Sequence, residues 1–198
     1  MNQYVTGAVI KKLREDRKMT QAELAEKISV SDKTISKWET GKGYPDITLL
    51  EPLAKALGIS MIELLAGQDI RNDNRAANML RTDFYVCPNC GNIIHTTGKA
   101  VISCCGITLP PLEAEAEDEA HAISVEAVED EWFVSIDHPM EKDHFISFVA
   151  GISGDYVQLV KLYPEGNAEA RFKRSRVKMI YAYCNHHGFF KKNLLKIK

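Results

Sequence analysis

The chain has 198 residues, 45% of them hydrophobic, and a formal charge of −2, so it is long enough for one or two small folded domains. No secretory signal is evident at the N-terminus, and no apolar run reaches the length of a membrane span, which makes the cytoplasm the expected compartment. In that compartment the 5 cysteines are expected to be metal ligands rather than disulfides. Residues 113–131 are mainly acidic and residues 161–198 strongly basic, and we interpret both as solvated surface.

Residues 1–66 predict a compact domain of five short helices. Apolar side chains recur at helical spacing from residue 5 to 17, and again over residues 49–57. Cap and stop residues mark the other boundaries: Thr20 with Glu23, Ser31, Gly41, Asp46, Gly58, and Ser60 with Glu63.

This segment resembles the phage-repressor (XRE-type) helix-turn-helix family through the pieces TQAELA, VSDKTISKWETG and LAKAL. The resemblance implies that the third helix lies in the major groove of double-stranded DNA, and that a dimer reads two half-sites. The implied contacts are Asp32, Lys33, Ser36 and Lys37 to base edges, and Gln21 and Lys42 to phosphates. Arg14 and Glu39 match a structural ion pair of the family. The alternative is a helical bundle used only for protein contacts or dimerisation.

Residues 67–82 are polar and predict a linker with a short helical turn near residues 76–80. Residues 83–112 follow with a Cys-x-x-Cys, Cys87 and Cys90, and a vicinal pair, Cys104 and Cys105. Two such pairs suit a tetrahedral site of four thiolates. The sequence leaves iron and zinc both open for this site.

Residues 113–198 contain short alternating stretches of apolar and β-branched residues, separated by turns, and predict an antiparallel β-sandwich. Residues 154–155 suit a hairpin turn between two of these stretches, and residues 164–167 suit another. Imidazole and thiolate side chains are scattered through it: His121, His138, His144, Cys184 and His187. Such side chains suit first-row transition metals. Four imidazoles and a thiolate exceed the ligand set of a structural zinc site and indicate a metal that accepts five or six ligands.

The motifs HPM at His138 and CN-x-HG at Cys184, with His144 between them, resemble the desulfoferrodoxin (superoxide reductase) family. The four-cysteine segment resembles the desulforedoxin module that precedes the iron domain in that family. The resemblance implies a ferrous ion with four equatorial histidines, an axial Cys184 and a position open for superoxide. His186 is not expected to be a ligand, because the family motif places one residue before the ligand His187. It also implies an immunoglobulin-like sandwich, iron rather than zinc at the four cysteines, and a small electron donor such as a rubredoxin. The dimer expected from the helix-turn-helix domain would be a homodimer.

One residue departs from that family. The family carries Glu-Lys before the first histidine ligand, whereas this chain has Glu119, the expected catalytic carboxylate, followed by Ala120. Lys142 is a conceivable substitute for the missing lysine. Three functions therefore compete. The first is a superoxide reductase joined to a DNA-binding domain, and the second is a transcriptional regulator that senses superoxide or oxygen through iron. The third is a repressor in which zinc has only a structural role and the β-domain only forms the dimer.

Overall fold

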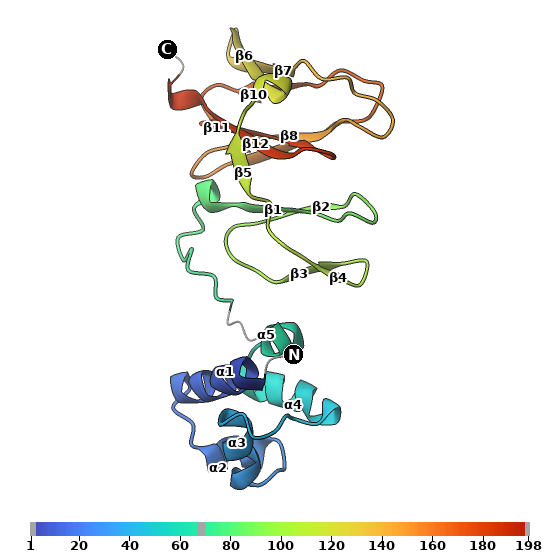
Figure 1. Ribbon diagram of the computed structural model, residues 1–198. Coiled ribbons are helices and arrows are strands. Elements are labelled where there is room, and N and C mark those ends of the chain that lie inside the picture. The colour runs from blue at the N-terminus through green and yellow to red at the C-terminus, as the bar shows by residue number, and fades with distance from the viewer. Residues whose placement is uncertain (1–2, 67–69, 197–198) are drawn as a thin grey trace. The chain divides into compact units, whose positions relative to one another are not determined.

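The computed structural model describes residues 3–66 and 70–196 and divides the chain into two compact units, Met1–Arg71 and Asn72–Lys198 (Figure 1). Residues 67–69 of the expected linker lie outside the described residues. Within the described ranges no helix combines the length and the apolar character that a membrane span needs. The order of element types matches the prediction of a helical domain, a small cysteine module and a β-sandwich.

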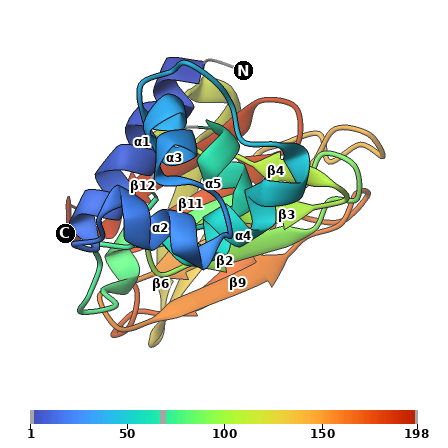
Figure 2. The same ribbon diagram turned by 90° about the horizontal axis from the view of Figure 1, so that it is seen from below.

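The described residues of the first unit form five helices: α1 (Gln3–Asp16), α2 (Gln21–Lys27), α3 (Asp32–Glu39), α4 (Ile47–Leu57) and α5 (Met61–Ala66) (Figure 2). The predicted caps are confirmed. Thr20 and Glu23 exchange both bonds of a capping box, and the Ser31 hydroxyl accepts from the backbone N–H of Thr34. Gly58 ends α4 in the left-handed conformation, with φ of 57°. These caps leave one apolar face per helix to form the core: Ile10, Leu13, Leu24, Ile35, Trp38, Leu53 and Leu57.

The second unit begins with a segment that is docked rather than free. The buried Asn74 side chain donates to the carbonyl oxygens of Asn78 and Thr97, at 2.9 and 2.5 Å. A short 3-10 helix, η1 (Met79–Arg81), follows close to the predicted helical turn. Two hairpins come next, β1 (Asp83–Val86) with β2 (Ile93–Thr96), and β3 (Ile102–Cys104) with β4 (Ile107–Leu109).

Two sheets then form the sandwich (Figure 1). One sheet has the order β10-β7-β6 and the other β5-β12-β11-β8-β9. Their bounds are β5 (Ala114–Ala116), β6 (Ile123–Val128), β7 (Glu131–Ile136), β8 (Ile146–Ile152), β9 (Val157–Lys161), β10 (Glu169–Lys173), β11 (Met179–Cys184) and β12 (Gly188–Asn193). Two 3-10 turns complete the unit, η2 (Glu119–His121) before β6 and η3 (Leu194–Lys196) after β12. All strand pairs are antiparallel except β5 with β12, which is parallel.

The sandwich core lies between the inward faces of the two sheets. Val134 and Phe172 come from one sheet, and Val149 and Ala182 from the other. A Cβ atom on Gly151 of β8 would lie only 2.6 Å from the ring of Phe172, so this strand needs a glycine for the sheets to approach.

Two details differ from the sequence prediction. Strand β6 lies inside the acidic stretch, where we expected only solvated surface. It can form there because Ile123 and Val125 point inward while Glu126, the next residue, is exposed. Residues 164–167 form a turn but not the predicted hairpin, since β9 and β10 belong to different sheets. The other predicted hairpin turn, at residues 154–155, does join the antiparallel strands β8 and β9.

Phe84 of β1 joins the cysteine module to the sandwich. Its ring packs at centroid distances of 5.6 Å from Phe148 and 5.4 Å from Phe189, which belong to β8 and β12. The backbone N–H of Leu112 donates to the Phe84 carbonyl at 2.7 Å. The module and the five-stranded sheet therefore share one hydrophobic cluster.

Candidate metal centres and the DNA-binding helix

Five metal-ligand side chains from distant parts of the chain meet at one end of the sandwich. Each offers one donor atom, and these atoms all lie within 4.8 Å of one another: His121, His138, His144, Cys184 and His187. The fold brings them together because η2, the loop between β7 and β8, the end of β11 and the β11–β12 turn all reach this end. The predicted convergence of these five residues is thus what the structure shows.

The donor spacing fits a single ion. Nδ1 of His187 lies 3.1 Å from Nε2 of His121 and 3.2 Å from Nε2 of His144. The Cys184 sulfur lies 3.5 Å from the same Nδ1 and 3.6 Å from Nε2 of His138. Neighbouring ligands about 2.1 Å from a metal and at right angles to each other would be about 3 Å apart. The residues present therefore suit a cation of five or more ligands.

Asp118 orients His121, although it was not among the site residues predicted from the sequence. Its Oδ1 accepts from Nδ1 of His121 at 2.8 Å and from the backbone N–H of the same residue at 2.8 Å. The hydrogen bond to His121 holds the pKa of Asp118 below its usual value. With the proton on Nδ1, the Nε2 lone pair of His121 faces the other donors. A carboxylate three residues before the histidine was the available signal.

Burial keeps part of this cluster neutral. Burial, and after it the neighbouring His144, His121 and His187, lower the pKa of His138 to about 4. The pKa of His187 is also lowered, by burial first and then by His121, His144 and His186. Neutral imidazole is the form that binds metals, so protons compete weakly for these donors at neutral pH.

The cluster is closed on one side and open on the other. Cys184 is fully buried and His121 is 3% exposed, whereas His187 is exposed. Glu119 and Ala120 are exposed in η2, next to His121 in the chain. Nζ of Lys142 lies 3.7 Å from a carboxylate oxygen of Glu165, and its side chain is 79% exposed. In this structure Lys142 is thus paired with a carboxylate.

The four cysteines of the small module form a second cluster. Sulfurs of Cys87, Cys90, Cys104 and Cys105 lie within 4.8 Å of one another, with 3.6 Å between Cys90 and Cys104. The edge of a tetrahedron with metal–sulfur distances of about 2.3 Å is about 3.8 Å. Gly91 and Cys105, with φ of 67° and 51°, adopt the left-handed conformation, which lets the chain turn at each pair of cysteines. These residues fit a tetrahedral metal.

The pKa values of the thiols in this cluster are shifted in opposite directions. Burial raises the pKa of the Cys87 thiol, but hydrogen bonds from the backbone N–H groups of Cys90 and Asn89 outweigh burial and bring the pKa to about 7. Hydrogen bonds with Cys90, Cys87 and Cys104 raise the pKa of Cys105 to about 12. Four thiolates at this spacing repel one another unless a cation lies between them.

In the helical unit, Arg14 and Glu39 form the predicted ion pair. The Arg14 guanidinium contacts both carboxylate oxygens of Glu39, at 2.6 and 3.0 Å, and both side chains are largely buried. The amide of Gln21 also donates to Glu39, at 2.7 Å, so this expected phosphate ligand is tied to the ion pair. The other expected DNA contacts lie on the outer face of α3 or just beyond it: Asp32, Lys33, Lys37 and Lys42 exposed, and Ser36 half-buried.

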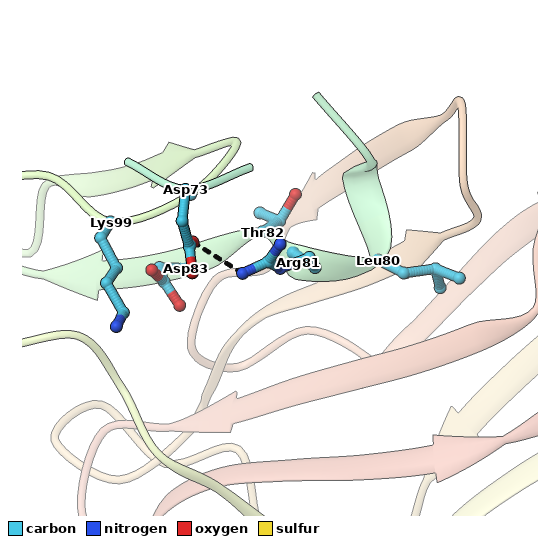
Figure 3. A pocket seen from close by; sticks show the side chains of 7 residues that line it. Asp73, Leu80, Arg81, Thr82, Asp83 and Lys99 are labelled. Atoms are coloured by element: carbon cyan, nitrogen blue, oxygen red, sulfur yellow. Dashed lines mark hydrogen bonds and ion pairs between the residues drawn. The ribbon is translucent and has the colours of Figure 1, made fainter. Parts of the chain in front are cut away.

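A pocket of about 210 Å³ lies away from both clusters (Figure 3). Its walls come from the segment before β1, the first residue of β1 and the β2–β3 loop: Asp73, Leu80, Arg81, Thr82, Asp83, Gly98 and Lys99. Arg81 donates to Asp73 at 2.7 Å across one side of it. None of the nine candidate ligands lines this pocket.

Comparison with known proteins finds two families along the chain. Residues 10–64 match a helix-turn-helix family, and residues 109–193 match the desulfoferrodoxin family. The helix-turn-helix region is 41% identical over 61 residues to the HTH-type transcriptional activator BcrR of Enterococcus faecalis, covering 31% of this chain and 30% of that protein. A desulfoferrodoxin homolog of Archaeoglobus fulgidus is 34% identical over 116 residues, which are 54% of this chain and 92% of the relative.

This chain spans 30% of the activator's length and 48% of the length of a desulfoferrodoxin from Clostridium acetobutylicum. The crystal structure of the superoxide reductase from Treponema pallidum superposes with a TM-score of 0.50 at 23% identity, over 57% of this chain and 98% of that one. That likeness shows a shared fold. The chain, with its helix-turn-helix domain at the N-terminus, belongs to the desulfoferrodoxin family.

Proposed function

We propose that the chain binds iron through His121, His138, His144, Cys184 and His187, and that it reduces superoxide to hydrogen peroxide. The observation that carries this proposal is the convergence of the five donor atoms within 4.8 Å. A bound ferrous ion supplies one electron, and superoxide takes up that electron and two protons to become hydrogen peroxide. Family membership implies iron at this site.

The chain's own residues would prepare the site for that reaction. Asp118 holds the ring of His121, and burial of Cys184 keeps its sulfur away from water. The exposed His187 marks the side from which a small anion can enter. Glu119, exposed at the start of η2, is our candidate for a carboxylate that approaches the iron and assists proton transfer.

The test is a stopped-flow superoxide assay on the iron-loaded full-length protein, with metal analysis of the same sample. A second-order reaction with superoxide that is lost in Cys184→Ser, and retained in the control His95→Ala, supports the proposal. His95 is an exposed histidine of β2 that is absent from both clusters. Stoichiometric zinc at the histidine site of freshly isolated protein, with no reaction after iron loading, would rule it out.

We assign the four cysteines to an iron centre that relays electrons from a small donor protein such as a rubredoxin, with zinc as the alternative. Four sulfurs without other donors suit either metal. The visible spectrum separates the two, because iron bound by thiolates absorbs in the visible range and zinc does not. Colour that persists in Cys184→Ser and disappears in Cys90→Ser would locate iron at the cysteines.

We also propose that α3 reads double-stranded DNA, with the chain acting as a homodimer on two half-sites in the cytoplasm. Exposed cations on and after α3 support this proposal, with Lys33 and Lys37 towards bases and Lys42 towards phosphate. Asp32 and Ser36 complete the base-reading set, and Gln21, which donates one amide N–H to Glu39, has a second amide N–H for a phosphate. Selection from a random DNA library tests the proposal, and binding that survives the double variant Lys33→Ala, Lys37→Ala with unchanged sequence preference would contradict it.

A second function, transcriptional regulation through the redox state of iron, is favoured by one specific observation. Ala120 stands where the family carries a lysine, so turnover would be slow while the metal site is complete. Operator affinity that differs between reduced and oxidised protein would support sensing, and equal affinity would remove it. The working domain boundaries for such experiments are 1–66, 67–82, 83–112 and 113–198.

A further inference from the structure

We propose that Asn185 and His186 are positioning residues that hold His144 in the metal site. The inference rests on the proposed metal site and adds to it a device that fixes a ligand carried by a loop. It gives a role to His186, which lies outside the five-donor cluster although it neighbours His187 in the chain.

His144 needs such a device because of where it lies in the fold. Residues 137–145, between β7 and β8, form neither helix nor strand. His121, in contrast, ends the 3-10 turn η2 and is held by the carboxylate of Asp118. His144 still presents Nε2 at 3.2 Å from Nδ1 of His187.

Asn185 fixes the backbone on both sides of His144. Its side-chain amide donates to the carbonyl of Asp143 at 2.6 Å, and its Oδ1 accepts from the backbone N–H of Phe145 at 2.8 Å. Its own backbone N–H donates to the Phe145 carbonyl at 3.2 Å. The residue before His144 and the residue after it are thus bound to one side chain, which sets the path of the loop.

His186 fixes the ring itself. The imidazoles of His144 and His186 stack with 4.7 Å between centroids and 20° between planes. The rings of His144 and His138 also form a T-shaped pair, with 4.5 Å between centroids and 80° between planes. Rotation of the His144 ring about its side chain would break the stack, so His186 restricts the ring to the orientation that aims Nε2 at the cluster.

The three consecutive residues 185–187 therefore act on His144 at three levels. Asn185 places its backbone, His186 its ring plane, and His187 lies beside its donor nitrogen. An aromatic ring at position 186 suffices for this role, because stacking does not need the imidazole nitrogens. A phenylalanine should therefore replace His186, whereas an alanine should not.

The experiment compares iron-loaded, full-length His186→Ala, His186→Phe, Asn185→Ala and the control His95→Ala. Iron release to an excess of chelator, and the electron paramagnetic resonance spectrum of the oxidised iron, are the readouts. We expect release to be about tenfold faster in His186→Ala and in Asn185→Ala, with a changed spectrum. We expect His186→Phe and His95→Ala to match the unmodified protein in both.

Two results would overturn the inference. If His186→Ala releases iron at the rate of the unmodified protein with an identical spectrum, or if His186→Phe is as impaired as His186→Ala, stacking does not hold His144. Failure of the proposed function has a different appearance. The unmodified protein itself would then lack the spectrum of iron bound by histidine and thiolate, and the inference would fall with it.

Discussion

Oδ1 of Asp118 and Nδ1 of His121 lie 2.8 Å apart, so a carboxylate fixes the tautomer of the histidine and turns its Nε2 towards the other donors. Partners of this kind commonly change metal affinity 10- to 100-fold. We expect Asp118→Ala to weaken iron binding about 10- to 100-fold, and Asp118→Asn to weaken it less, since an amide oxygen still accepts. Competition with a calibrated chelator measures the change, and an unchanged affinity in Asp118→Ala would contradict the assigned role.

Ala120 offers a direct test of the anion-capture step. It is exposed in η2 and precedes His121, so a lysine here places a cation beside the site. We expect Ala120→Lys to raise the second-order rate constant for superoxide about tenfold at low ionic strength, with a smaller gain at high salt. The control is Ala127→Lys, which adds the same charge at an exposed position of β6, about 13 Å beyond the start of that strand. Equal rates in both variants would show that local charge does not limit capture.

Acid should destabilise the metal-free protein through His138. Its pKa is about 4 in the folded state against a usual value of 6.5, so the unfolded chain binds more protons between these values. The free energy of unfolding should therefore fall as pH decreases from 6.5 to about 4, by on the order of 1–3 kcal/mol from this residue. Urea unfolding of metal-free protein at several pH values measures the slope. His138→Gln should flatten it, and a slope that does not change would assign the acid sensitivity to other groups.

The Arg14–Glu39 ion pair should contribute to the stability of the helical domain. Glu39→Gln leaves the largely buried guanidinium of Arg14 without its charged partner, and we expect a loss of about 2 kcal/mol. The control is Glu15→Gln, because the carboxylate of Glu15 also lies near Arg14, at 3.5 Å, but is 55% exposed. That variant should lose less than about 1 kcal/mol. Equal losses in the two variants would show that burial of the pair is unimportant.

Much of the fold and of the ligand sets could be predicted from sequence because the signals are local. Thr20 with Glu23 marks a helix start whatever surrounds it, and Gly58 marks an end, since both act within one turn. The candidate ligands were predictable in part from spacing, because Cys184 with His187 and Cys87 with Cys90 carry chemical meaning on their own. The remaining histidines were assigned through the family resemblance.

What escaped prediction depends on contacts between distant segments. Nothing near Gln21 indicates that its amide binds Glu39, and nothing near His186 indicates that its ring meets His144. Strand pairing behaves in the same way. The parallel register of β5 with β12, in which Phe189 lies opposite Ala114, arises only once the chain has crossed the sandwich.

The packing of Phe84 between Phe148 and Phe189 affects thermal stability and limits which segments can be deleted. The cysteine module supplies part of the hydrophobic cluster that it shares with the five-stranded sheet. Deleting residues 83–112 would therefore expose aromatic rings of that sheet to water. In metal-loaded protein, removal of the metal from the four cysteines should likewise lower the melting temperature of the whole second unit. The stability of the two candidate metal sites is thus coupled, although their residues come from separate stretches of chain.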